Sequence, residues 1–73
     1  MKTTKRLAVK MKHFELVQKG KYEVAQKLFW LLRRGYLRLG SGNDISNEAD
    51  KICEMLGLRY RVNRHWGTVE YFI

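Results

Sequence analysis

The chain contains no proline, a single cysteine, and only 7 acidic residues against 15 lysines and arginines. The one cysteine, Cys53, excludes an internal disulfide and a zinc site built from several thiolates. The longest apolar run, residues 28–32, is far too short to cross a membrane as a helix. No apolar segment follows the basic N-terminus, so we expect no secretory signal and an intracellular protein.

Hydrophobic residues make up 45% of the 73-residue chain, which is the composition of a globular protein. This length suits one domain, and we expect a single small basic domain over residues 1–73, a monomer whose residues 1–5 are flexible. A domain of about 60 residues buries only about 60% of the surface of its unfolded chain. Such a core is too small to enclose a deep enzymatic cleft.

The net charge of +8 predicts an acidic partner, which is a nucleic acid, an anionic membrane or an acidic protein surface. This charge is distributed unevenly along the chain. Residues 1–12 carry five cations and no acid, whereas residues 44–56 carry four acids and one lysine. The charge therefore predicts binding without identifying the partner.

Two segments have the apolar spacing of amphipathic helices. Residues 21–34 are rich in good helix formers, and Gly35 is placed to end the helix. The apolar positions of this helix are Val24, Leu28, Leu31 and Leu32. A second helix begins with Asp44 or Ser46 as its N-cap and ends at Gly57. Its apolar positions are Ala49, Ile52, Cys53 and Leu56.

Apolar residues alternate with charged or small ones in three places. Residues 7–11 alternate and predict a half-buried strand, while residues 14–17 fit either its continuation or a helical turn. Residues 58–63 and 68–73 predict a hairpin around the loop of residues 63–67, with Tyr60 and Val62 among the inward positions. Residues 36–39 could form a short extended segment, and the sequence does not decide this assignment.

A hairpin alone is only marginally stable, so we expect the strand over residues 7–11 to pair with it. The predicted fold class is α+β. Two helices pack on a small, mostly antiparallel three-stranded sheet that ends in a C-terminal β-hairpin.

No residue pattern in the chain is typical of a catalytic centre. His13, His65 and Cys53 are the candidates, and they lack the spacing of a metal site, which needs three or four ligands. Cys53 lies on the apolar stripe of the second helix and fits a buried core thiol. The acids of residues 44–56 fit the helix dipole and solubility better than a cation site. We therefore predict no enzyme, no bound metal and no cofactor.

Basic and aromatic residues provide the candidate partner-binding site. The alternation places four cations on the outward face of the predicted sheet: Arg6, Lys10, Arg59 and Arg61. Arg64 and Trp66 lie in the hairpin loop, where Trp66 is either an exposed interface anchor or folded back over the core. Part of residues 29–31 must be exposed, because five consecutive apolar residues cannot all face inward on one helix.

The charge and the expected elements fit three classes of binding protein to different degrees. A nucleic-acid binder such as a winged-helix protein matches the order of helix, helix and hairpin. Its recognition helix would be the acidic segment 44–56, which phosphates repel. A membrane-surface binder is disfavoured, because we find no large apolar face beside the basic N-terminus. A protein-binding regulator with a basic face fits the uneven charge and the arginine and tryptophan residues.

Three segments resemble a known family. Residues 7–14 (LAVKMKHF), 29–34 (FWLLRR) and 69–73 (VEYFI) look like those of the small RNA-polymerase-binding transcription regulators of lytic Xanthomonas phages. Length and basicity also match, and the resemblance covers the whole chain without a diagnostic motif. It implies a phage protein in the cytoplasm of the bacterial host that binds the core of the host RNA polymerase, at its largest subunit. It also implies inhibition of transcription initiation, which causes host shutoff, and antitermination.

We therefore predict a non-enzymatic regulator that acts by protein–protein contact with bacterial RNA polymerase. The alternative is a winged-helix-like or other small basic protein that binds nucleic acid directly. With a charge of +8, either protein also binds nucleic acid weakly and non-specifically at low salt. No binding residue follows from the resemblance, so the candidate site rests on the residue pattern.

Overall fold

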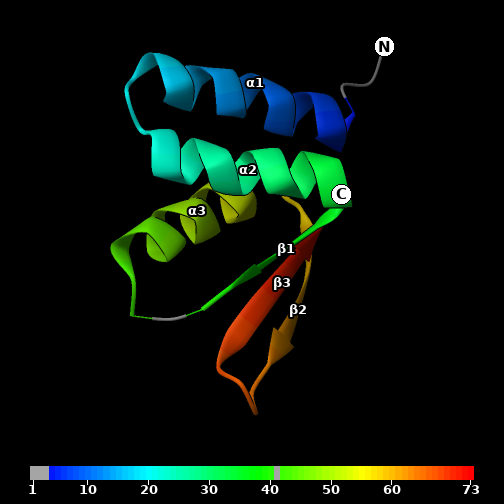
Figure 1. Ribbon diagram of the computed structural model, residues 1–73. Coiled ribbons are helices and arrows are strands. Elements are labelled where there is room, and N and C mark those ends of the chain that lie inside the picture. Colours follow the sequence, from blue (N-terminus) through cyan, green and yellow to red (C-terminus); the bar gives the residue numbers. More distant parts are fainter. Residues whose placement is uncertain (1–3, 41) are drawn as a thin grey trace.

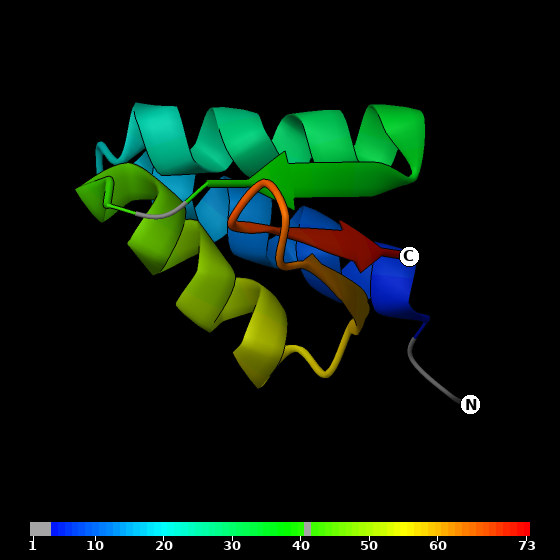
Figure 2. The same cartoon turned by 90° about the horizontal axis from the view of Figure 1, so that it is seen from below.

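A computed structural model of the protein describes residues 4–40 and 42–73. The elements follow in the order α1 (Lys5–Gln18), α2 (Tyr22–Arg34), β1 (Tyr36–Leu39), α3 (Asp44–Met55), β2 (Arg59–Asn63) and β3 (Thr68–Phe72). Helices α1 and α2 form an antiparallel pair that lies above α3 and the sheet (Figure 1). Seen from below, β1 runs along α2, and α3 crosses at an angle to both (Figure 2).

The three strands of the described residues form one antiparallel sheet in the order β1-β3-β2. Strands β2 and β3 are the predicted C-terminal hairpin, so the α+β class and the small three-stranded sheet are confirmed. The third strand is β1, the segment that the sequence left open as a short extended piece. It pairs with β3 with Leu37 opposite Tyr71 and Leu39 opposite Val69.

The prediction of a strand over residues 7–11 is wrong, because this segment belongs to helix α1. Val9 and Leu16 are seven residues apart and are both buried, whereas Leu7 and Met11 are exposed on the opposite side of the helix. A helix that is apolar on two faces imitates the alternation of a strand over a short window. The domain therefore has three helices in its described part, rather than the two predicted.

Helix α1 begins within the segment of residues 1–5 that the sequence analysis expects to be flexible. The side chain of Thr4 accepts a hydrogen bond of 3.1 Å from the backbone amide of Leu7, which is the geometry of an N-cap. Lys5 is the first helical residue, and its ammonium donates to the Leu56 carbonyl at 2.9 Å. Residues 1–3 lie outside the described residues.

Helices α2 and α3 lie where the sequence predicts them. Gly35 ends α2 with a φ of 83°, in the left-handed region that glycine adopts without a steric penalty. The predicted N-caps of α3, Asp44 and Ser46, are wrong by one to three residues. Asn43 caps this helix, because its side-chain oxygen accepts from the amides of Ile45 and Ser46.

The core lies between the three helices and the side of the sheet that faces them. Its buried apolar residues are Val9, Leu16, Val24, Ala25, Leu28, Leu31, Leu37, Leu39, Ala49, Ile52, Cys53, Leu58 and Tyr71. Tyr60 and Val62 face the same side of the sheet but are 66% and 56% exposed. The alternation therefore predicts the correct side of the sheet for both residues, but they are not buried, because α3 packs against β1 rather than against β2.

We expect Ile52→Asp to abolish the cooperative thermal unfolding transition in circular dichroism. Ile52 is buried among the core residues of α3. An unpaired buried carboxylate costs several kcal/mol, which is comparable with a total stability of about 5–15 kcal/mol. Lys51→Asp is the matched control, because it places the same carboxylate at an exposed position of the same helix. A melting curve of Ile52→Asp like that of the control contradicts this packing.

Burial raises the pKa of the Cys53 thiol to about 12, from 9.0 in an exposed thiol, and Asp50 contributes to the rise. Between these two values the folded protein keeps a proton that the unfolded chain has lost. The free energy of unfolding therefore falls as the pH rises above 9, by up to about 1.4 kcal/mol per pH unit. We expect urea unfolding at pH 8 to 10 to show a steeper loss of stability for the wild type than for Cys53→Ala. Parallel profiles would exclude this linkage.

Candidate interaction surface

The outer face of the sheet, which points away from the helices, carries a row of charged residues across the three strands. Arg38 of β1 lies opposite Glu70 of β3, and Glu70 lies opposite Arg61 of β2. The guanidinium groups of Arg61 and Arg38 approach the Glu70 carboxylate at 3.3 Å and 3.8 Å. Glu70 is therefore only 6% exposed, although it is on the outer face. One acid between two arginines leaves this row positively charged.

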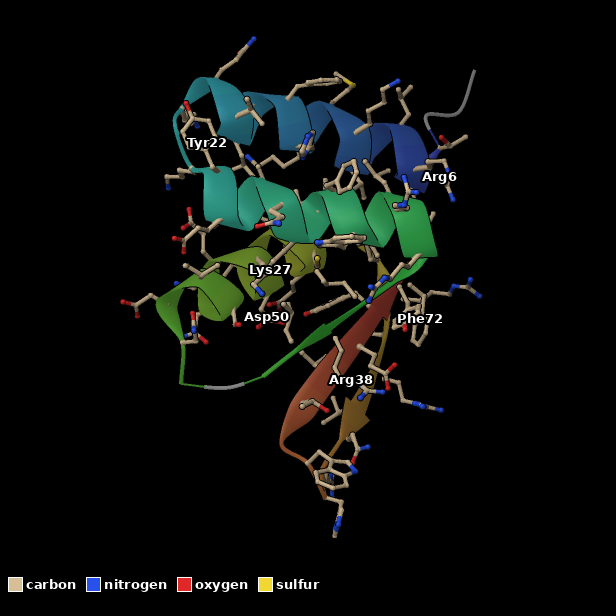
Figure 3. The ribbon with its side chains drawn as sticks, viewed as in Figure 1. Arg6, Tyr22, Lys27, Arg38, Asp50 and Phe72 are labelled. Carbon is tan, nitrogen blue, oxygen red and sulfur yellow. The ribbon has the colours of Figure 1, made fainter. Side chains whose placement is uncertain are left out.

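The neighbouring row on the same face is aromatic. Tyr36 of β1 lies opposite Phe72 of β3, which lies opposite Arg59 of β2. Figure 3 shows Arg38 and Phe72 projecting on the same side of the molecule. The outer face of the sheet thus combines three arginines with two aromatic rings.

Helix α2 continues this surface beyond the edge of the sheet. The guanidinium carbon of Arg34 lies 4.7 Å from the centre of the Trp30 ring, a cation–π contact. Trp30 and Arg34 line a shallow depression where α2 meets β1, together with Lys27 of α2 and residues of β1. We call this region the α2–β1 surface. It comprises Lys27, Trp30, Arg34, Tyr36 and Arg38.

Ring contacts extend the α2–β1 surface towards α1. The ring centres of Trp30 and Phe29 are 5.6 Å apart, those of Phe29 and His13 6.2 Å, and those of His13 and Phe14 5.6 Å. The Nδ1 of His13 donates to the Ala25 carbonyl at 2.8 Å, which ties α1 to α2 beneath these rings. Phe29 and Trp30 are exposed while Leu31 is buried, as expected for a partly exposed run over residues 29–31.

The structure brings together only part of the predicted site. Arg59 and Arg61 share the outer face of the sheet, as predicted. The placement of Arg6 and Lys10 on that face is wrong, because both belong to helix α1. Arg6 donates to the Leu32 carbonyl of α2 at 2.7 Å, and Lys10 is exposed on α1. The error follows directly from the misassigned strand.

The hairpin tip holds the remaining predicted residues, Arg64 and Trp66, at the end of the molecule opposite α1 (Figure 1). The side chain of Asn63 accepts from the amides of His65 and Trp66 at 3.1 Å and 3.2 Å, which holds the turn. Trp66 is 73% exposed, so the alternative in which it folds over the core is wrong. Its ring packs against His65, away from the aromatic residues of α2.

The acidic segment, residues 44–56, contains all of α3, and two of its carboxylates have partners within the domain. Glu48 pairs with Lys21, and Asp50 accepts a hydrogen bond from the hydroxyl of Tyr71. Burial and this hydrogen bond raise the pKa of Tyr71. Among the residues that the structure describes, no group of three or more His, Cys, Asp or Glu side chains is arranged to hold a metal ion.

Sequence reasoning missed Arg34, Tyr36 and Arg38 as site residues. The alternation of residues 36–39, with two apolar and two exposed positions, is the pattern that would have identified β1. A strand next to β3 would have placed Tyr36 and Arg38 on the same face as the hairpin arginines.

No known protein family, curated protein or solved structure matches the chain. Within the described residues, each helix is too short or too polar to span a membrane.

We expect Arg61→Glu to lower the free energy of unfolding by about 1–3 kcal/mol, because a second carboxylate would face the buried Glu70. Arg59→Glu is the matched charge reversal on the same strand and face, opposite Phe72. We expect Arg59→Glu to lower the free energy of unfolding less than Arg61→Glu does. Urea unfolding of the two variants measures the difference, and equal stabilities would contradict the structural role of the Arg61–Glu70 pair.

Proposed function

We propose that this protein is a non-enzymatic transcription regulator that binds bacterial RNA polymerase by protein–protein contact. The observation that carries the proposal is the α2–β1 surface together with the outer face of the sheet. Trp30, Arg34 and Tyr36 are of the three residue types most enriched among interface residues that dominate binding energy. The surrounding arginines suit an acidic surface on the partner.

The distribution of charge supports a protein partner over a nucleic acid. Helix α3 precedes the hairpin and would be the recognition helix of a winged-helix protein. It carries four acids and one lysine between residues 44 and 56, and phosphates in a DNA groove would repel them. A protein partner that contacts the basic surface is free of this conflict.

The resemblance of residues 7–14, 29–34 and 69–73 to phage regulators of RNA polymerase supports the partner and the consequence of binding that we propose. The partner is the polymerase core, contacted at its largest subunit, and the effects are inhibition of initiation and antitermination. A binding protein without catalytic residues acts on such an enzyme by occupying a surface or by stabilising one of its conformations. This mechanism needs only the interaction surface.

Direct binding of nucleic acid is the second candidate function, and the topology favours it. A helix followed by a hairpin, with β1 added to the hairpin on the β3 side, is the strand arrangement of winged-helix domains. The exposed aromatic rings beside arginines are also the chemistry that stacks on unpaired bases. The two candidates differ in what the isolated protein binds at physiological salt.

We expect Arg34→Ala to weaken binding to purified bacterial core RNA polymerase at least tenfold, a change of about 1.4 kcal/mol. The loss of the cation–π contact and of a central cation is the physical reason. Arg33→Ala is the matched control, because Arg33 is an exposed neighbour in the same last turn of α2. Biolayer interferometry at roughly physiological salt measures both. Equal affinities of the two variants would place the contact elsewhere.

We expect the isolated protein to show no tight, sequence-selective binding to DNA at physiological salt. A specific duplex binder keeps a dissociation constant of about 10⁻⁸ M or lower under these conditions, whereas non-specific attraction to a basic protein weakens. Fluorescence anisotropy with promoter duplexes, random duplexes and single-stranded oligonucleotides tests this expectation. Selective nanomolar binding to any of them would support the second candidate function and overturn the first.

A further inference from the structure

Helix α1 is apolar on the face that points away from the core. Leu7, Met11 and Phe14 are 46%, 62% and 54% exposed. Their spacing of four and three residues places them in one line along the helix, opposite the buried Val9 and Leu16. We call this line the outer stripe.

None of the three outer-stripe residues belongs to the buried core of the domain. The outward face of a surface helix is normally polar, whereas here it carries three large apolar side chains. Single exposed apolar residues are ordinary, but a contiguous exposed set marks a site of interaction.

We propose that the outer stripe of α1 inserts into an apolar groove with an acidic rim on the partner protein. This inference rests on the proposed function, for which it makes α1 the anchoring helix. Residues at positions i, i+4 and i+7 are the anchors by which a helix fills such a groove.

Hydrogen bonds to other elements fix the position of helix α1 before any partner binds. Arg6 donates to the Leu32 carbonyl, His13 to the Ala25 carbonyl and Lys5 to the Leu56 carbonyl. These three bonds fix α1 against the rest of the domain with the outer stripe facing outward. Figure 3 labels Arg6 at the N-terminal end of α1. A preformed binding helix loses little conformational entropy when it docks.

The charge of α1 favours an acidic partner protein over a second copy of this chain. Lys5 and Arg6 bond to the rest of the domain, so they do not flank the outer stripe. Lys10 lies on one side of the outer stripe and Glu15 on the other. Glu15 is already paired with Lys12 at 3.2 Å and Lys19 at 3.0 Å, and these lysines lower its pKa. Beside the outer stripe, Lys10, Lys12 and Lys19 therefore outnumber the single acid, Glu15. An acidic rim would complement this excess of positive charge, whereas a second copy of α1 would bring the same cations together.

An anionic membrane surface fits less well. An interfacial helix needs a wide apolar face, whereas the outer stripe is a narrow line with Gln18 at its end and the charged Lys10 and Glu15 beside it. The outer stripe is also continuous with the α2–β1 surface through the ring contacts of Phe14, His13 and Phe29. One protein partner can contact both regions.

The test measures binding to purified core RNA polymerase by Met11→Glu and by its matched control, Met55→Glu. The two methionines are 62% and 68% exposed, on α1 and α3, so both variants should fold and carry the same net charge. We expect Met11→Glu to weaken binding at least tenfold and Met55→Glu to bind like the wild type. Met11→Lys should lose less affinity than Met11→Glu, because a lysine suits an acidic rim. Circular dichroism melts confirm that each variant is folded.

The outcomes separate this inference from the proposed function. If wild-type protein does not bind the polymerase, the proposed function fails and the partner named here fails with it. If the wild type binds and Met11→Glu binds equally well, only the inference is overturned. Two other results also overturn the inference, provided that Met11→Glu still binds the polymerase. In the first, Met11→Glu abolishes a dimer that the wild type forms in sedimentation experiments. In the second, it abolishes binding to vesicles of phosphatidylglycerol and phosphatidylcholine.

Discussion

Burial of the apolar face of α2 holds the other elements together. This helix packs against α1, α3 and β1, and its Leu28 and Leu31 are fully buried where these elements meet. Close packing around these two residues sets the distances between the helices and the sheet. The partly exposed side of the same helix carries Trp30 and Arg34, so the element that organises the core also positions the interaction surface.

Most of the acidic side chains form ion pairs or hydrogen bonds with other residues of the domain. Glu70 lies between two arginines on the sheet, Asp50 accepts from Tyr71, and Glu48 pairs with Lys21. Glu15 is neutralised by two lysines of its own helix region. Glu70 and Glu15 each lie beside two cations, so the outer sheet face and α1 keep a net positive charge. The electrostatic character of the protein therefore follows from its internal contacts as well as from its composition.

Local patterns predicted the elements whose apolar residues lie on a single face. Helix α2, helix α3 and the C-terminal hairpin follow from spacing, caps and glycines that act over a few residues. Helix α1 was assigned wrongly because Val9 and the outer-stripe residues lie on opposite faces, and such a pattern has no single period. The same two-faced pattern leaves Leu7, Met11 and Phe14 exposed on the side of α1 opposite the core.

The sequence by itself determined the basic character of the protein, its α+β class, the buried thiol of Cys53 and the outward arginines of the hairpin. Each of these depends on composition or on neighbours a few residues apart. The tertiary structure decided that β1 pairs with β3, and so that Tyr36 and Arg38 join Arg59 and Arg61 on one face. It also decided that α1 covers α2, which left Leu7, Met11 and Phe14 outside. These outcomes depend on contacts between residues far apart in the chain, and the choice among such pairings is made by the packing of the whole core.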